Sequence, residues 1–484
     1  MPKRLLDQRW PWLVAAGVIV LVFVSTFVDI RMPGKHWDPR PLGTPDDIAR
    51  LRERGDVNVL FILIDMLRAD HLGSYGYARD TSPTLDRLGA SGIRFARQIS
   101  QSSWTKASMA SLWTSLYPVH TGITRFDHVL PDDPVMAPEI LQKAGFQTIG
   151  LYRNGWVAPT FGFSQGFQVY QHPHSVVVPV NAPENPTITE NSTDEGAVEA
   201  ALEFLRINGS RRWFLYLHLM DVHEYIYDEE SALFGTDHVG IYDNSIRHTD
   251  SVIGVFLDYL AEDGYLDNTV VVVSADHGEA FGERGYDGHA REVFRETTEV
   301  PFIVSLPFRL EPGVVVRSHT SNVDVMPTLL DLVGLAAAPG VDGRSRVPEV
   351  IAVARGQEPP PADHTVIAQL DQNWGQPGFD PQNMVAVLDD EYRYVRADQR
   401  SGRVEQIFDY REDPAELRDR MDDKPEGLAN LQQIAETYLG QKPPWGASPK
   451  REINELELNQ LRALGYALPE AHKPVPRKKI DVRR

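Results

Sequence analysis

Four short runs of branched apolar residues mark the first two thirds of the chain. Residues 57–64 form the first run, and three others have the same character: 213–217, 269–274 and 300–304. Continuous apolar runs of this length predict strands that are buried on both faces, as in a parallel sheet. Helical patterns lie between them, for example at 249–262 and 325–332. Strands that alternate with helices predict an α/β sandwich with a mainly parallel central sheet.

The pattern changes after about residue 335. Residues 336–362 are rich in Ala, Pro and Gly and resemble a long excursion, and short strand-like pieces follow at 365–370, 384–388 and 392–396. These pieces predict a small antiparallel sheet. We therefore expect a main domain at 56–335, a small C-terminal α+β subdomain at 336–467, and a disordered tail at 468–484 that is basic and Pro-rich.

The N-terminal region has a different pattern. Residues 10–28 are uncharged, and as a helix they would span roughly 28 Å, close to the thickness of a bilayer core. Three basic residues, Lys3, Arg4 and Arg9, precede the run and favour a cytoplasmic N-terminus. We expect a cytoplasmic segment at 1–9, a transmembrane anchor at 10–29 and a linker at 30–55. The alternative is a cleaved signal peptide. Either way, the catalytic domain would lie outside the cytoplasm, on the periplasmic or extracellular side.

Composition narrows the function without deciding it. The formal net charge of −20 argues against nucleic acid as a partner, because phosphate binding needs clustered Lys and Arg. The chain has no cysteine, so thiolate metal sites and a cysteine nucleophile are excluded.

Acidic residues follow two of the apolar runs. The first run leads into Asp65, and the Val-rich run leads into Asp276-His277-Gly278. Sites in open α/β sheets form beyond the carboxyl ends of the strands. Two carboxylates and an imidazole that meet there would form a site for a divalent cation. An Asp after a strand is otherwise a turn residue or a helix cap.

Residues 102–112 have the pattern of a helix start, with Thr105 at or near the N-cap. The backbone N–H groups and the helix dipole favour an anion at this position. A hydroxyl that touches a metal here can ionise and attack phosphorus or sulfur. The alternative is that Thr105 is only a cap.

Several histidines lie outside these segments. Asp221-Val222-His223 follows one of the predicted strands, and His289 lies twelve residues after His277. Asp221, His223 and His289 would form a second cation site or hold the anionic oxygens of a substrate. His218 and His120 fit a structural or solvated role.

Together these segments resemble the sulfatase and alkaline phosphatase superfamily, in particular its membrane-anchored, sulfatase-like bacterial members. The similarity covers residues 57–467, with its strongest patches in the same order as in the family: 63–73, 82–95, 105–122, 217–223, 276–289, 408–414 and 461–466. The resemblance implies an alkaline-phosphatase-like sandwich and a covalent intermediate on a metal-bound nucleophile. It implies metal ligation by Asp65, Thr105, Asp276 and His277, and it implies that Thr105 is the nucleophile. By the same resemblance, His223 and His289 would contact the substrate or a second metal and take part in catalysis.

The chain departs from the formylglycine sulfatases at the nucleophile. They have Cys or Ser, then Pro two residues later and Arg four residues later, whereas this chain has Thr105, Ala107 and Met109. A threonine cannot become the formylglycine aldehyde, because oxidation of its secondary alcohol gives a ketone. In addition, Met66 replaces the usual second carboxylate, and His277 replaces the usual Asn.

A hydroxyl nucleophile with Asp-His resembles instead the phosphodiesterase and phosphoryl-transferase branches. Two carboxylates, a hydroxyl and an imidazole favour zinc or manganese, with calcium as an alternative. Lys106 would supply the substrate-binding charge that is lost at Met109.

The resulting hypothesis is a metal-dependent hydrolase that cleaves a phosphate or sulfate ester of a lipid or glycan through a covalent intermediate on Thr105. Two alternatives remain open. One is a phosphoryl-group transferase that acts on envelope lipid or glycan, with the N-terminal helix in the membrane. The other is a pseudoenzyme that binds anionic ligands without turnover.

Overall fold

The computed structural model describes residues 38–173, 192–360, 365–375 and 379–452. The predicted anchor at 10–29 and the basic tail at 468–484 lie outside the described residues. Among the described helices, none is long and apolar enough to cross a membrane. The described residues from Arg40 onward form one compact unit.

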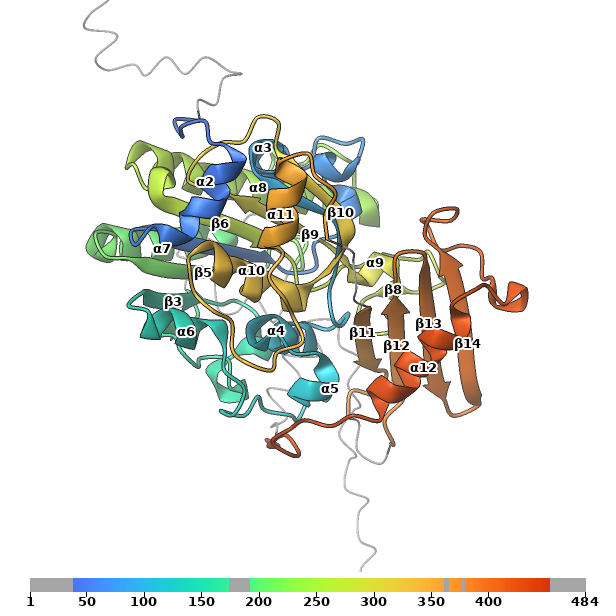
Figure 1. The fold of residues 1–484 in the computed structure, drawn as a ribbon. Coiled ribbons are helices and arrows are strands. Elements are labelled where there is room, and N and C mark those ends of the chain that lie inside the picture. The colour runs from blue at the N-terminus through green and yellow to red at the C-terminus, as the bar shows by residue number, and fades with distance from the viewer. Residues whose placement is uncertain (1–37, 174–191, 361–364, 376–378, 453–484) are drawn as a thin grey trace, which may run out of the picture. The chain divides into compact units, whose positions relative to one another are not determined.

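An eight-stranded sheet forms the centre of this unit (Figure 1). Its strand order is β10-β2-β9-β6-β1-β5-β3-β4. All neighbouring strands are parallel except β9, which runs antiparallel to both β2 and β6. The bounds are β1 Asn58–Ile64, β2 Ile93–Ile99, β3 Gln147–Leu151, β4 Val169–Gln171, β5 Trp213–Leu219, β6 Thr269–Ser274, β9 Glu299–Ser305 and β10 Val314–Ser321. This sheet confirms the predicted α/β fold with a mainly parallel sheet.

Alternate side chains of β1 enter two separate cores, because successive residues of a strand point to opposite faces. Val59, Phe61 and Leu63 enter one core, and Leu60, Ile62 and Ile64 enter the other. The first core is covered by α2 Pro45–Arg50, α4 Thr105–Thr114, α6 Ala137–Lys143, α10 Val325–Leu332 and α11 Val347–Ala354. The second is covered by α3 Pro83–Ser91, α7 Asp194–Asn208 and α8 His238–Glu262.

Two helices differ from the expectation. Helix α8 begins eleven residues before the predicted 249–262, where the side chain of Asp237 accepts a hydrogen bond from Gly240 N and caps the first turn. Helix α11 lies within the expected excursion at 336–362 and packs against β10 and α2. The remaining short elements are α5 Pro118–Thr121, α9 Arg295–Thr298 and the two-stranded pair β7 Ala280–Phe281 and β8 Asp287–Gly288.

A second, four-stranded sheet follows in the C-terminal part of the chain. It is antiparallel, as predicted, in the order β11 Val366–Asp371, β12 Asn383–Leu388, β13 Tyr392–Gln399 and β14 Gly402–Asp409. Helix α12, Leu428–Leu439, packs on one face of it through Leu431, Ala435 and Tyr438. Strand β14 was not predicted, because its first residues are polar and exposed.

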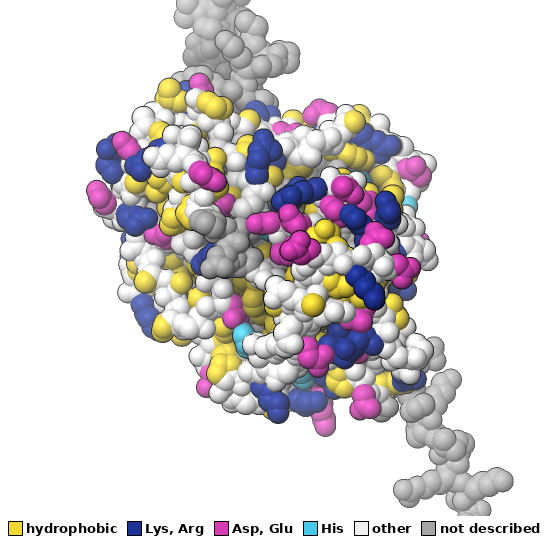
Figure 2. Space-filling view, turned by 45° about the vertical axis from the view of Figure 1, so that its right-hand side comes forward, with side chains coloured by type: hydrophobic (Ala, Val, Ile, Leu, Met, Phe, Trp, Pro, Cys, Tyr) yellow, Lys and Arg dark blue, Asp and Glu magenta, His cyan; other side chains and the backbone are white. Residues whose placement is uncertain are grey.

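Charged side chains of both signs are mixed on the surface. Figure 2 shows Lys and Arg interspersed with Asp and Glu over the face in view. On this face the basic side chains therefore form no separate cluster.

Candidate functional site

The carboxyl ends of three neighbouring strands place the candidate residues at one edge of the large sheet. Strand β1 lies between β5 and β6 and is parallel to both, with Leu63 paired to His218 on one side and to Ser274 on the other. Asp65 follows β1 directly, and Asp276 follows β6. The parallel register therefore brings the two carboxylates together, as predicted from the sequence.

Asp65 is fully buried, and one of its two carboxylate oxygens accepts hydrogen bonds. Its Oδ2 accepts hydrogen bonds from Asn154 Nδ2 at 2.7 Å and His218 Nε2 at 3.0 Å, whereas its Oδ1 has no hydrogen bond within the described part of the chain. Burial opposes its ionisation, but the charges of His223, His277 and His218 and the hydrogen bond from His218 outweigh burial and hold the Asp65 pKa below its usual range. Asp65 is therefore ionised, with one oxygen open to a further ligand.

Asp276, like Asp65, has one carboxylate oxygen with hydrogen-bond partners and one without. Its Oδ1 accepts from the backbone N–H groups of Met66 at 3.2 Å and His277 at 2.9 Å, and its buried Oδ2 has no hydrogen-bond partner in the described ranges. Burial and the nearby charge of Asp65 raise the pKa of Asp276. Two adjacent buried carboxylates, each with one unpartnered oxygen, leave a local excess of negative charge that a cation would offset.

Met66 follows Asp65 directly and has an unusual backbone conformation. Its backbone is left-handed, with φ at 67°, and its N–H donates to Asp276. Its side chain is buried in one of the two cores of the large sheet. This position therefore supplies a backbone donor to the site instead of an acidic ligand.

Thr105 lies at the first residue of α4, and Trp104 occupies the N-cap position. The Thr105 Oγ1 atom is 3.1 Å from His277 Nε2 and 3.4 Å from Asn154 Nδ2. Ser108 fixes the same helix to the Asp276 segment, because its hydroxyl donates to the Asp276 carbonyl at 2.6 Å. The hydroxyl thus faces the site, in contrast to the alternative in which Thr105 acts only as a cap.

His277 has its two ring nitrogens in different surroundings. Its Nδ1 lies 2.9 Å from the Gly278 carbonyl, which can only accept, so Nδ1 carries a proton. Its Nε2 lies 3.6 Å from Asp65 Oδ1 and 3.4 Å from Asp276 Oδ2, in addition to its contact with Thr105. Burial lowers the pKa of His277, but the charges of Asp276 and Asp65 outweigh burial and raise it. Asp65, Thr105, Asp276 and His277 therefore converge, as predicted.

His218 and Asn154 are site residues that the sequence reading missed. His218 was assigned a structural role, yet its Nε2 contacts Asp65 and its Nδ1 lies 2.9 Å from Tyr216 Oη. Asp65, His218 and Asp276 offer ligand atoms within 4.8 Å of one another. Their positions at strand ends could have identified both residues as part of the site. His218 lies in β5 beside the end of β1, and Asn154 follows β3 at the same edge of the sheet.

His223 and His289 line the same site. The His289 ring stacks on His277 with centroids 4.4 Å apart and lies 5.1 Å from the His223 ring. His289 Nδ1 is 2.7 Å from Glu279 Oε2, and His223 Nε2 makes no hydrogen bond to the described residues. Burial lowers the pKa of His223 to about 4, so this imidazole is neutral near pH 7. A neutral imidazole can bind an ester oxygen or a metal ion.

Lys106 lies apart from this group. Its Nζ donates to the Phe126 carbonyl at 2.9 Å and lies 3.6 Å from the centre of the Phe161 ring and 5.4 Å from that of Trp156. Burial lowers its pKa well below the usual value. None of these contacts involves the carboxylates or Thr105, so the expected substrate contact of Lys106 stays a prediction.

The small C-terminal sheet holds the segment that carries His289. Trp374 Nε1 donates to the Ala290 carbonyl and Gln372 Nε2 to the Arg291 carbonyl, both at 2.8 Å. Immediately before Ala290, the His289 imidazole reaches the site. The residues that follow β11 of the small sheet thereby position the segment that carries the His289 imidazole.

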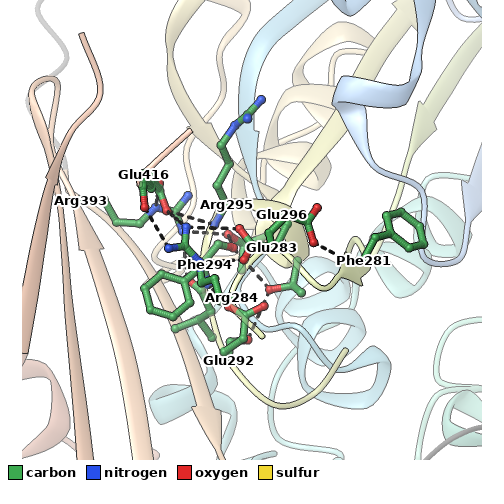
Figure 3. A network of polar contacts seen from close by, with 12 residues as sticks. Phe281, Glu283, Arg284, Glu292, Phe294, Arg295, Glu296, Arg393 and Glu416 are labelled. Carbon is green, nitrogen blue, oxygen red and sulfur yellow. Dashed lines mark hydrogen bonds and ion pairs between the residues drawn. The ribbon is translucent and has the colours of Figure 1, made fainter. Parts of the chain in front are cut away.

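A network of buried ion pairs also links the small sheet to the segment around His289 (Figure 3). Glu416, which follows β14, pairs with Arg393 of β13 at 2.6 Å and with Arg284 at 3.3 Å. Arg284 in turn pairs with Glu296 at 2.7 Å and lies 4.0 Å from the centre of the Phe294 ring. Arg284 follows β7, and Glu296 lies in α9, so the network joins the small sheet to the 276–298 segment.

The donor set fits a divalent transition-metal ion. The unpartnered oxygens Asp65 Oδ1 and Asp276 Oδ2 and the imidazole His277 Nε2 face one another beside the Thr105 hydroxyl. Mixed oxygen and nitrogen donors suit zinc or manganese better than calcium, whose ligands are normally oxygens. His218 holds Asp65 as an outer partner, an arrangement that is common around metal-binding carboxylates.

The chain is similar to known sulfatases over much of its length. The sulfatase family profile matches residues 57–335, and the profile described as N-sulphoglucosamine sulphohydrolase, C-terminal, matches residues 282–439. N-acetylgalactosamine-6-sulfatase of Homo sapiens is 26% identical over 344 residues, which cover 61% of this chain and 66% of that protein. Ulvan-active sulfatase of Formosa agariphila is 24% identical over 326 residues, which cover 59% and 63%. The matched regions thus span just under two thirds of these relatives' own lengths.

Solved structures show the same fold. A 2-O GAG sulfatase has a TM-score of 0.63 at 19% identity, with 80% of this chain and 92% of that chain covered. The phosphonate monoester hydrolase of Agrobacterium radiobacter has a TM-score of 0.62 at 19% identity, with 79% and 95% covered. The family profile matches more than half of the chain, and this protein therefore belongs to the sulfatase family.

Proposed function

We propose that this protein is a hydrolase that cleaves a sulfate or phosphate ester by attack of the Thr105 hydroxyl. The observation that carries the proposal is the position of Thr105 Oγ1, 3.1 Å from His277 Nε2 and beside two carboxylates with unpartnered oxygens. Membership of the sulfatase family supports ester hydrolysis, and the relatives named above are sulfatases.

Asp65, Asp276 and His277 would hold a divalent cation, and Thr105 would be its fourth protein ligand. When bound, such an ion lowers the pKa of a hydroxyl and offsets the negative charge of the reacting ester. Its charge also explains why the site is built from two buried carboxylates that would otherwise repel each other.

The chain's own residues account for the two steps of the reaction. Thr105 Oγ1 would lose its proton and form a bond to phosphorus or sulfur, the bond to the alcohol oxygen would break, and the departing alcohol would take up one proton, which balances the proton that Thr105 lost. Water then hydrolyses the Thr105 ester, which releases phosphate or sulfate and restores the hydroxyl. His223 and His289 would bind the ester or the leaving oxygen, since both imidazoles face the site.

The substrate class follows from two separate arguments. The relatives' names mention ulvan and N-acetylgalactosamine-6-sulfate chemistry, which favours a sulfated glycan. The threonine in place of a formylglycine precursor favours a phosphate ester instead. The N-terminal segment 10–29 would hold the domain at the outer side of a membrane, close to lipid or glycan substrates.

An assay of an aryl sulfate beside an aryl phosphodiester, with zinc or manganese added, tests the proposal. Thr105→Val should abolish hydrolysis of whichever ester is cleaved, because valine keeps the shape of the side chain without an oxygen nucleophile. Thr105→Ser is the matched control, because it restores a hydroxyl at the same position. Undiminished turnover by the valine variant would remove Thr105 from its proposed role.

A further inference from the structure

A second group of acidic residues surrounds Arg153 and His248. Arg153 contacts Asp194, Asp221 at 2.6 Å and Glu224 at 2.9 Å. Asp221 was expected to act with His223 and His289, but its carboxylate belongs to this group instead. The acidic residues and His248 come from the first turn of α7, the segment after β5 and the middle of α8, and Arg153 follows β3.

Three ligand atoms in this group lie close together. Glu195 Oε1, Asp221 Oδ2 and His248 Nε2 are all within 4.8 Å of one another. His248 Nε2 is 3.0 Å from the Glu195 oxygen and 3.6 Å from the Asp221 oxygen. Ligand atoms on a tetrahedral zinc, each about 2.0 to 2.1 Å from the ion, lie roughly 3.3 Å apart. The two measured distances lie on either side of that value.

His248 is buried, with 3% of its surface exposed, and within the described ranges neither ring nitrogen has a hydrogen bond of acceptable geometry. Glu195 Oε2 is also buried without a partner among these residues. On the other side of the ring, Asp228 Oδ2 lies 3.4 Å from His248 Nδ1. A histidine that binds a metal usually directs its second nitrogen to a carboxylate in this way.

Burial lowers the pKa of His248, but its contacts with Asp221 and Glu195 outweigh burial and raise that pKa to about 10, so a protonated His248 balances part of the negative charge of this group. Asp194, Asp221 and Glu224 contact Arg153, and Glu195, Asp221 and Asp228 contact His248. Burial raises the pKa of Asp194 to about 6 and that of Glu224 to about 7, which shows that uncompensated charge is costly here. A divalent ion or a proton on His248 would reduce the excess.

We propose that Glu195, Asp221 and His248 bind a second divalent cation, of the zinc or manganese class. Two carboxylate oxygens and one imidazole nitrogen form a donor set that suits these ions. The bound ion would join α7, α8 and the segment after β5. That segment carries His223 two residues after Asp221, so the second ion would fix the position of a substrate-facing imidazole.

Zinc counting on the full-length protein tests this proposal. Chelator-treated protein is dialysed against Zn²⁺, and the bound zinc is measured by elemental analysis. Glu195→Gln and His248→Gln should each bind one equivalent fewer than the unaltered protein. Glu199→Gln is the matched control, because Glu199 lies one turn further along α7, is exposed, and should leave the zinc content unchanged.

The same comparison in an Asp276→Asn background separates this site from the Thr105 centre. There too Glu195→Gln should remove one equivalent, and added zinc should raise the melting temperature only when Glu195 is intact. Because Glu195 is partly exposed, its variant should fold even if the His248 variant does not. Equal zinc content with and without the Glu195 substitution would overturn the proposal and leave protonated His248 as the balancing charge.

Discussion

The hydroxyl oxygen of Thr105 lies 3.1 Å from Nε2 of His277, although the two residues are 172 positions apart in the chain. The contact depends on the parallel register of β1 and β6 and on the hydrogen bond from Ser108 to the Asp276 carbonyl. These features fix α4 against the strand end that carries Asp276 and His277. The account of function rests on this relationship.

Chelation should abolish ester hydrolysis. The reason is that two buried carboxylates with unpartnered oxygens leave the charge of the site unbalanced when no cation is bound. Zinc or manganese should restore activity, and calcium should restore less, because an imidazole is among the donors. Activity assays after dialysis against EDTA, followed by titration with each metal, measure this. Full activity in the chelated protein would contradict the metal assignment.

His218→Asn should lower kcat or metal affinity by about 10- to 100-fold, the range found for residues that orient a metal-binding carboxylate. His218 contacts Asp65 Oδ2, so its loss frees the carboxylate to rotate. Tyr216→Phe is the graded control, because it removes only the hydroxyl behind the imidazole and should have a smaller effect. A His218 variant with unaltered kinetics and metal affinity would return this residue to a purely structural role.

Arg393→Met should destabilise the protein by about 3 to 5 kcal/mol, the usual cost when one partner of a buried ion pair is removed. Its guanidinium pairs with Glu416 and donates to the Val293 carbonyl and the Thr298 hydroxyl at 2.9 Å. Adding Glu416→Gln should recover part of the loss, because it removes the uncompensated buried charge. Urea unfolding of the single and double variants measures both effects. A double variant no more stable than Arg393→Met would argue against the pair as the source of the loss.

Glu292 should make the protein less stable as the pH rises. Burial and the charge of Glu296 raise the pKa of Glu292 to about 8, above its value in the unfolded chain. The protonated form therefore favours folding below the unfolded pKa, and this contribution is lost as the pH rises from about 4.5 through 8.

Glu292→Gln should remove this part of the pH dependence, because glutamine stays neutral over the whole interval. Melting temperatures from pH 5 to 9 for the two proteins test the assignment. Glu358→Gln serves as the control, since Glu358 is exposed and should leave the profile unchanged. Parallel profiles for the unaltered and Glu292→Gln proteins would show that another group titrates.

Several residues of this site could be predicted from the sequence, because they follow strands with a clear apolar pattern. The apolar runs before Asp65 and Asp276 mark strand ends, and strand ends in a parallel sheet meet at one edge. His218 directly follows the predicted run 213–217 and lies within the longer strand β5, and the face on which its side chain lies cannot be assigned without the register of the strands. Asn154 follows the shorter strand β3, which carries a weaker apolar signal.

Long-range pairings explain the other differences. Strand β9 runs antiparallel to both neighbours, and an apolar run has no property that reports its direction. Asp221 and His223 are two residues apart in the chain but belong to different clusters, because Asp221 faces Arg153, which arrives from the end of β3. Neither the direction of β9 nor the contact between Asp221 and Arg153 can be predicted from the spacing of these residues in the sequence.

The covalent intermediate on Thr105 is the central claim, and mass spectrometry of the protein quenched in acid during turnover of an aryl ester tests it most directly. The account predicts a phosphate or sulfate adduct on the peptide that contains Thr105, and no adduct in the Thr105→Val protein. An actively hydrolysing protein that forms its adduct on another residue would contradict the account.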